Sequence, residues 1–233
     1  MDFEFKFKKF GVFHSESTMK VGTDAILLGS LVNLQKNNSV LEIGTGCGII
    51  SLMLAQRFSN QITAIEIDQN SAMQAKQNIL HSPWRKRINV IYDDVRNHSF
   101  KQKFDVIVSN PPYFQSGLLS KNHQKSIARH ANSLNFKELL EICQKLLTDN
   151  GCFWLVLPIV SYEIFESESQ FLGFYCDQKI NIQNSRKQEV SLIVTKWVKQ
   201  KTTPHIHNLA IRNNDGSYSD EYTLLTCDFH PFF

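Results

Sequence analysis

The feature that most constrains this fold is a group of glycines directly after a short apolar run. Residues 39–43 form the run, and Gly44, Gly46 and Gly48 follow it with G-x-G-x-G spacing. A short apolar run that ends in glycine is typical of a buried strand, and glycine lets the chain bend sharply and lets a ligand approach the backbone. Apolar residues then recur at helical spacing over 47–57. The sequence therefore predicts a strand, a tight turn and a helix.

The same alternation of strand and helix patterns continues along most of the chain. Asp68 is a predicted N-cap and Gly151 a predicted helix stop. Alternation of this kind, closed by two β-rich runs, predicts an α/β fold with a mostly parallel sheet and an antiparallel final strand. Further strands are predicted at 62–67, 88–92, 104–109, 152–157, 174–182 and 190–198, and further helices at 70–80, 136–147 and 161–171.

The two ends of the chain differ from this central pattern. Residues 2–10 alternate aromatic and charged side chains, which predicts one strand. Residues 202–233 are less regular, with a turn at 213–216. We therefore expect an N-terminal segment (1–38), a core (39–200) and a C-terminal extension (201–233) packed on that core.

The composition is that of an ordinary folded protein, with 42% hydrophobic and 20% charged residues. The longest apolar stretch, residues 152–160, contains Pro158 and is far shorter than the ~20 residues that cross a bilayer. The five cysteines form no C-x-x-C pair, and His130, His205 and His207 lack ligand-spaced partners. We expect a cytoplasmic protein without a metal or a membrane.

The net charge of +3 permits a nucleic-acid partner without requiring one. The basic residues gather in three clusters, which are candidates for phosphate contacts if they are not simply solvated surface. The clusters are Lys6, Lys8 and Lys9; Arg85, Lys86 and Arg87; and Lys121, Lys125 and Arg129.

Acidic residues follow the next two predicted strands. Glu66 stands about 20 residues beyond the glycines, where a carboxylate can accept both hydroxyl hydrogens of a ribose. A dinucleotide fingerprint would need glycine where Ile49 stands. The glycine spacing instead resembles the first motif of S-adenosylmethionine-dependent methyltransferases with a Rossmann-like sheet. In that setting Asp93 or Asp94 can accept a hydrogen bond from the adenine amino group of the cofactor.

The tetrapeptide Asn110-Pro111-Pro112-Tyr113 follows the fourth strand and resembles the signature of methyltransferases that modify a planar amino or amide nitrogen. Such a nitrogen is a poor nucleophile because its lone pair is delocalised. The side-chain carbonyl of Asn110 and the backbone carbonyl of Pro111 can each accept one N–H, which aims the lone pair at a sulfonium methyl. The prolines stiffen the loop, and Tyr113 offers a stacking face.

Segments along nearly the whole chain resemble bacterial tRNA (adenine-N6) methyltransferases that act at position 37 of a valine tRNA, in the anticodon stem-loop. Besides the glycine turn and Asn-Pro-Pro-Tyr, these segments are M-K-V-G-T-D at 19–24, S-P-W at 82–84, and I-R, Y-S and Y-T between 211 and 223. The resemblance implies a class I methyltransferase fold and S-adenosyl-L-methionine as cofactor. By this resemblance, the residues that border the methionine part of the cofactor are Lys20, Gly22, Thr23 and Asp24, and those that cradle it are Glu42, Gly44, Gly46 and Gly48. The resemblance further implies that Glu66 holds the ribose and that Asp94 approaches the adenine. Asn110 is then expected to lie between the cofactor and the substrate.

Three other interpretations share part of this pattern. Release-factor glutamine methyltransferases also carry Asn-Pro-Pro-Tyr, but they usually have a helical domain in front, for which 38 residues leave too little room. A DNA adenine methyltransferase needs a target-recognition region, and residues 114–134 offer little space for one. A non-catalytic cofactor-binding protein that helps RNA to fold would have no use for the two acceptors at Asn110 and Pro111.

Overall fold

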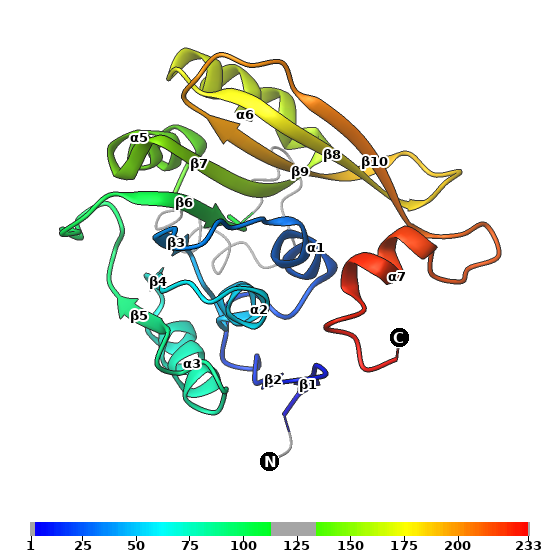
Figure 1. Cartoon of the computed structure of the whole chain (residues 1–233), viewed down its shortest axis with the longest axis horizontal. Helices are drawn as coiled ribbons and strands as arrows, with labels where there is room; N and C mark the ends of the chain where they lie inside the picture. Colours follow the sequence, from blue (N-terminus) through cyan, green and yellow to red (C-terminus); the bar gives the residue numbers. More distant parts are fainter. Residues whose placement is uncertain (1–2, 113–133, 233) are drawn as a thin grey trace, which may run out of the picture.

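The computed structural model describes residues 3–112 and 134–232, and an eight-stranded sheet forms its centre (Figure 1). The strand order is β10-β8-β9-β7-β6-β3-β4-β5. The strands of this sheet are β3 (Val40–Ile43), β4 (Ile62–Glu66), β5 (Ile88–Tyr92), β6 (Phe104–Ser109), β7 (Leu147–Pro158), β8 (Tyr175–Ser185), β9 (Val190–Val198) and β10 (His205–Arg212). The helices are α1 (Thr23–Leu31), α2 (Ile49–Arg57), α3 (Gln69–Leu80), α5 (Phe136–Leu146), α6 (Ile159–Phe171) and α7 (Asp220–Thr226).

Strand direction in the sheet agrees with the predicted α/β fold. β3 pairs in parallel with β4 on one side and β6 on the other, and β5 and β7 extend the parallel set. β9 runs antiparallel to both of its neighbours, β7 and β8. It is the antiparallel strand that the sequence predicted to close the core. β10 then joins the edge of the same sheet, parallel to β8.

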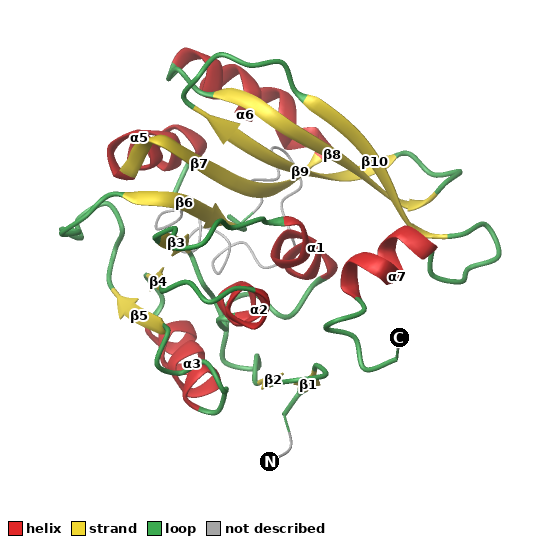
Figure 2. Ribbon diagram, viewed as in Figure 1, coloured by secondary structure: helices red, strands yellow, loops and turns green. Residues whose placement is uncertain are grey.

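Helices cover both faces of the sheet (Figure 2). The apolar side chains of α1 and α2 pack with one face, and those of α5 and α6 pack with the other. The neighbouring residues Phe153 and Trp154 of β7 contribute to opposite faces, as the alternation of side chains along a strand requires. Both are almost fully buried, and each contributes roughly 1.5–3 kcal/mol of hydrophobic stabilisation.

Side-chain caps begin α3 and α5. Asp68 accepts a hydrogen bond from the backbone N–H of Ser71 at 2.8 Å and begins α3, which confirms the predicted N-cap. Asn135 and Glu138 form a reciprocal capping box that begins α5. The Asp68 cap fixes the start of α3 directly after the end of β4.

Two predictions about local structure are wrong. Residues 2–10 do not form one strand: β1 (Phe5–Lys6) pairs with β2 (Gly11–Val12) around a turn in which the Phe7 N–H donates to the Phe10 carbonyl. Gly151 does not stop a helix either, because α5 ends at Leu146 and Gly151 lies inside β7. A Cβ on Gly151 would lie 3.1 Å from the Asp105 carbonyl oxygen, so glycine there permits close approach of β6 and β7.

The C-terminal residues are more regular than the sequence indicates. β10 pairs with β8 along its length, and Ser219 caps α7 by accepting from the Tyr222 N–H at 3.1 Å. Because β10 pairs with a strand that is distant in sequence, β10 could not be predicted from a local sequence pattern. The division of the chain at residues 38 and 200 stays a prediction.

Candidate active site

The glycine turn between β3 and α2 has the backbone conformation that only glycine adopts without strain. The φ angles of Gly44, Gly46 and Gly48 are 73°, 56° and 84°. The N–H groups of Gly44 and Thr45 both donate to the Ile65 carbonyl at 2.9 and 3.2 Å, which ties the turn to β4. Apart from Gly44 itself and its two chain neighbours, no described residue has a heavy atom within 4 Å of the position that a Cβ of Gly44 would occupy. The turn therefore leaves open space beside its backbone.

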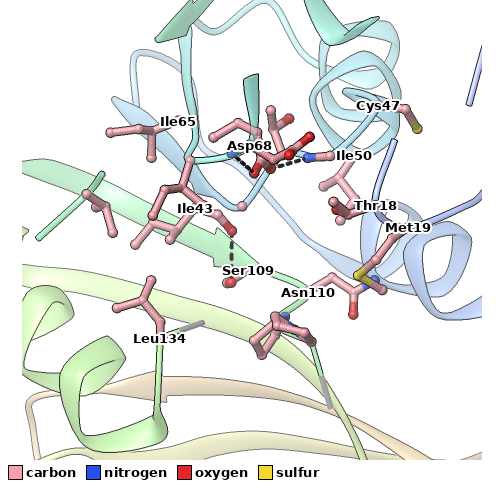
Figure 3. A pocket seen from close by; sticks show the side chains of 18 of the residues that line it. Thr18, Met19, Ile43, Cys47, Ile50, Ile65, Asp68, Ser109, Asn110 and Leu134 are labelled. Atoms are coloured by element: carbon pink, nitrogen blue, oxygen red, sulfur yellow. Dashed lines mark hydrogen bonds between the residues drawn. The ribbon is translucent and has the colours of Figure 1, made fainter. Parts of the chain in front are cut away.

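That open space belongs to a cavity of about 560 Å³ (Figure 3). It lies at the carboxyl ends of β3, β4 and β6, where the chain order of the parallel strands reverses. This is where ligands bind in open α/β sheets, and the volume suits a small-molecule ligand. Of the residues predicted for the site, Lys20, Gly44, Gly46, Glu66, Asp94, Asn110, Pro111 and Pro112 line the cavity.

Glu66 presents an oriented carboxylate to this cavity. Its Oε2 accepts from the Gly46 N–H at 2.8 Å, and its Oε1 accepts from the Asp68 N–H at 2.9 Å. Burial raises the pKa of Glu66. Each carboxylate oxygen has more than one lone pair, so the backbone bonds fix the group and leave acceptor capacity for a ligand.

Glu42 lies behind the glycine turn and not in the cavity wall. Its side chain is 1% exposed. Oε2 accepts from the Thr45 hydroxyl at 2.8 Å, from the Ser51 N–H at 3.0 Å and from the Ser51 hydroxyl. Oε1 is buried without a hydrogen-bond partner among the described residues. Burial raises the pKa of Glu42 to about 7. Through its bonds to Thr45 and Ser51, Glu42 joins the glycine turn to the start of α2.

Asp94, which is predicted to approach the adenine of the cofactor, lines the cavity, and Arg96 holds its carboxylate. The Arg96 Nε donates to both oxygens at 2.9 and 2.8 Å, and its Nη2 lies 2.7 Å from Oδ2. This hydrogen bonding lowers the pKa of Asp94. Arg96 itself lines the cavity and was not predicted; the Asp-x-Arg spacing was the only sign of it in the sequence.

Asn110, Pro111 and Pro112 form the wall of the cavity at the end of β6. The Asn110 side chain is 8% exposed, and its Nδ2 donates to Oδ2 of Asp24 at 3.0 Å. The preceding Ser109 hydroxyl donates to the Ile43 carbonyl at 2.9 Å (Figure 3), which joins the strand end to β3. Tyr113 lies outside the described residues.

The segment before α1 covers part of the cavity. Thr18, Met19 and Lys20 line it, and neither Thr18 nor Met19 was predicted. The Thr18 N–H donates to the Ser71 hydroxyl at 3.0 Å. Asn78 anchors the same segment by exchanging two hydrogen bonds of 2.8 Å with the Phe13 backbone. The predicted site residues outside the lining are Gly22, Thr23, Asp24, Glu42 and Gly48.

Within residues 3–112 and 134–232 no group of three or more His, Cys, Asp or Glu side chains could hold a metal ion. In the same residues no helix is long and apolar enough to cross a membrane.

Comparison with known sequences identifies methyltransferases as relatives of this chain. The family model described as "Methyltransferase small domain" matches residues 4–160. Curated relatives that carry the name tRNA1(Val) (adenine(37)-N6)-methyltransferase include proteins of three bacteria. That of Photorhabdus laumondii is 35% identical, over 98% of this chain and 96% of the relative. That of Vibrio campbellii is 39% identical, over 97% and 95%. That of Bacteroides fragilis is 38% identical, over 97% and 97%.

Solved structures share the fold at low sequence identity. A predicted O-methyltransferase from Agrobacterium tumefaciens superposes with a TM-score of 0.70 at 17% identity, over 88% of this chain and 96% of that one. A methyltransferase from Pyrococcus furiosus gives 0.60 at 20% identity, over 82% and 90%. A glycopeptide N-methyltransferase complexed with (S)-adenosyl-L-methionine gives 0.55 at 12% identity, over 78% and 100%. These likenesses confirm the class I methyltransferase fold.

Proposed function

Because this chain belongs to the family of tRNA1(Val) (adenine(37)-N6)-methyltransferases, we propose that it methylates N6 of adenine 37 in the anticodon stem-loop of a valine tRNA. It is an S-adenosylmethionine-dependent tRNA adenine-N6 methyltransferase. The observation that carries the proposal is the Asn110 amide, which lines the cavity beside the glycine turn. A tRNA substrate implies action in the cytoplasm.

The cavity fits S-adenosyl-L-methionine. It has the volume for a small molecule, an open glycine turn, and a buried carboxylate aimed inward from the end of β4. Glu66 would accept the ribose hydroxyls, and Asp94 would lie toward the adenine. Gly44, Gly46 and Lys20 would border the rest, while Glu42 and Gly48 support the turn from behind. When bound, the cofactor supplies an electrophilic methyl group on a sulfonium.

Asn110 and Pro111 would prepare the target nitrogen for attack. The Asn110 Oδ1 and the Pro111 carbonyl each accept one N–H of the adenine amino group. The two hydrogen bonds draw the nitrogen toward tetrahedral geometry and direct its lone pair at the methyl group. Because both acceptors belong to a proline-stiffened segment at a strand end, their positions are set before substrate binds. Catalysis therefore rests on positioning.

Two basic clusters distant in sequence lie together and suit a tRNA backbone. Phe10, next to Lys9, packs edge-on against Trp84, next to Arg85, with ring centroids 5.6 Å apart. Lys6, Lys8, Lys9, Arg85 and Lys86 are exposed. Arg87 differs from these residues, because its guanidinium is held within the fold: it donates to the Phe58 carbonyl and, at 2.6 Å, to the Ala55 carbonyl at the end of α2. The cluster of Lys121, Lys125 and Arg129 lies outside the described residues.

The rival interpretations lose support from the relatives. The curated relatives match nearly the full length of this chain and are named as tRNA adenine methyltransferases, so a release-factor glutamine methyltransferase is not favoured. The same names weigh against a non-catalytic RNA-folding protein.

Single-turnover methylation of valine tRNA by Asn110→Ala tests the proposal. Loss of one acceptor is expected to slow methyl transfer about 150-fold, equivalent to roughly 3 kcal/mol in the transition state. Cofactor affinity, measured by calorimetry, should change little. Asn89→Ala, an exposed asparagine of β5, is the matched control. Wild-type methylation by Asn110→Ala, or wild-type activity on tRNA with guanine in place of adenine 37, would refute the proposal.

A further inference from the structure

The side chain of Asn110 is hydrogen-bonded to a carboxylate. Its Nδ2 donates to Oδ2 of Asp24 at 3.0 Å, although the two residues are 86 positions apart in the sequence. Asn110 lines the cavity, whereas Asp24 does not. Asp24 stands in the first turn of α1, where the helix N-terminus favours a negative charge. The carboxylate therefore contacts the amide without itself lining the cavity.

An ionised carboxylate can only accept hydrogen bonds, so it discriminates between the two ends of an amide. The Asn110 amide can satisfy Asp24 only with its NH₂ group, which turns Oδ1 away from Asp24. Rotation of the amide by half a turn would place Oδ1 against the carboxylate and present N–H groups to the substrate. An amine that must donate its hydrogens cannot bind such a face productively. The orientation of the amide therefore decides whether Asn110 can act.

The chain leaves room for this carboxylate at Gly22. A Cβ on Gly22 would lie 2.3 Å from Oδ1 of Asp24, so any larger residue would displace the carboxylate. The φ angle of Gly22 is −125°, which other residues adopt freely. Space for Asp24, and not backbone freedom, is thus the physical need for glycine at this position.

We propose that Asp24 is a positioning residue that locks the Asn110 amide with its oxygen toward the target amine. The inference rests on the proposed adenine methylation and assigns Asp24 a role separate from contact with the methionine part of the cofactor. A hydrogen bond to a charged acceptor also polarises the amide, which makes Oδ1 a stronger acceptor.

The test measures single-turnover methylation of valine tRNA at saturating S-adenosyl-L-methionine, with cofactor affinity from calorimetry. Asp24→Ala should slow methyl transfer about 10- to 100-fold with cofactor affinity nearly unchanged. Asp24→Asn should restore part of the rate, because its side-chain oxygen can still accept from Nδ2. Gly22→Ala keeps the carboxylate and displaces it, so it should also slow transfer. Thermal unfolding of each variant confirms that it is folded.

A double-mutant comparison separates positioning from a general structural effect. Because Asp24 acts through Asn110, adding Asp24→Ala to Asn110→Ala should change the rate less than about twofold. An equal loss from Asp24→Ala in both backgrounds would overturn the positioning role while leaving the proposed function intact. A tenfold weaker cofactor affinity with an unchanged saturated rate would also overturn it. A wild-type rate in Asn110→Ala alone refutes the acceptor mechanism and this inference together.

Discussion

Replacing Glu42 by glutamine should remove a pH dependence from the stability of the protein. Burial raises the pKa of Glu42 from 4.5 to about 7. Between these values the folded state keeps a proton that the unfolded state releases, so the free energy of unfolding falls as pH rises. The shift corresponds to about 3 kcal/mol, fully present below pH 4.5 and lost as pH passes 7. Burial of the anion is the cause, and three hydrogen bonds to Oε2 offset only part of it.

Glutamine is a suitable reference because it fits the asymmetry of the site. Its oxygen can take the place of Oε2, and its NH₂ group can take that of Oε1, which has no partner among the described residues. Any cost of burying that NH₂ group is the same at every pH. Other titrating groups are common to both proteins and cancel in the difference.

Urea unfolding of both proteins from about pH 5 to about pH 8 provides the measurement. The wild-type free energy of unfolding should fall by about 2.5 kcal/mol relative to Glu42→Gln across this range, because part of the effect is already lost at pH 5. Glu141→Gln, which removes an exposed carboxylate 3.9 Å from Lys137, is the control and should give a nearly constant difference. Parallel pH curves for wild type and Glu42→Gln would show that the buried carboxyl titrates normally and would refute the reasoning.

Two further predictions concern ligand and substrate binding. Glu66→Ala should weaken S-adenosyl-L-methionine binding about 5- to 150-fold in calorimetry, because two ribose hydroxyls lose their acceptor; unchanged affinity would remove Glu66 from the site. Replacing Lys6, Lys8 and Lys9 together by glutamine should reduce the slope of log affinity for tRNA against log salt by about 0.7–0.9 for each true phosphate contact. An unaltered slope would identify these lysines as solvated surface.

The parts of the fold that were predicted correctly depend on short-range patterns. β5 and β6 have the predicted bounds, and Asp68 caps α3 as expected. Each of these follows from apolar spacing and a cap within a few residues. The prediction of one strand at residues 2–10 failed because one strand and two short strands joined by a turn show the same alternation of aromatic and charged residues. The turn of the hairpin, residues 7–10, contains no glycine or proline from which it could be predicted.

The parts that were missed depend on contacts between distant segments. β10 forms because β8 offers a free sheet edge, and no local feature of residues 205–212 shows that edge. The contact between Asp24 and Asn110 is of the same kind. The resemblance assigned both residues to one site, Asn110 after a predicted strand and Asp24 in the M-K-V-G-T-D segment at 19–24. It could not show which atoms would meet.

Three acidic residues near the glycine turn carry the same chemical group, a carboxylate, but have different roles. Glu66 accepts one backbone N–H on each oxygen and faces the cavity, so it keeps acceptor capacity for a ligand. Glu42 accepts all of its bonds from the turn and helix that it joins, so it supports structure. Asp24 uses an oxygen to orient an amide. The predicted strands place Glu42 and Glu66 at neighbouring strand ends, and the structure adds Asp24 in α1, the helix before the glycine turn. The direction of their hydrogen bonds, which packing determines, separates ligand binding from support and from positioning.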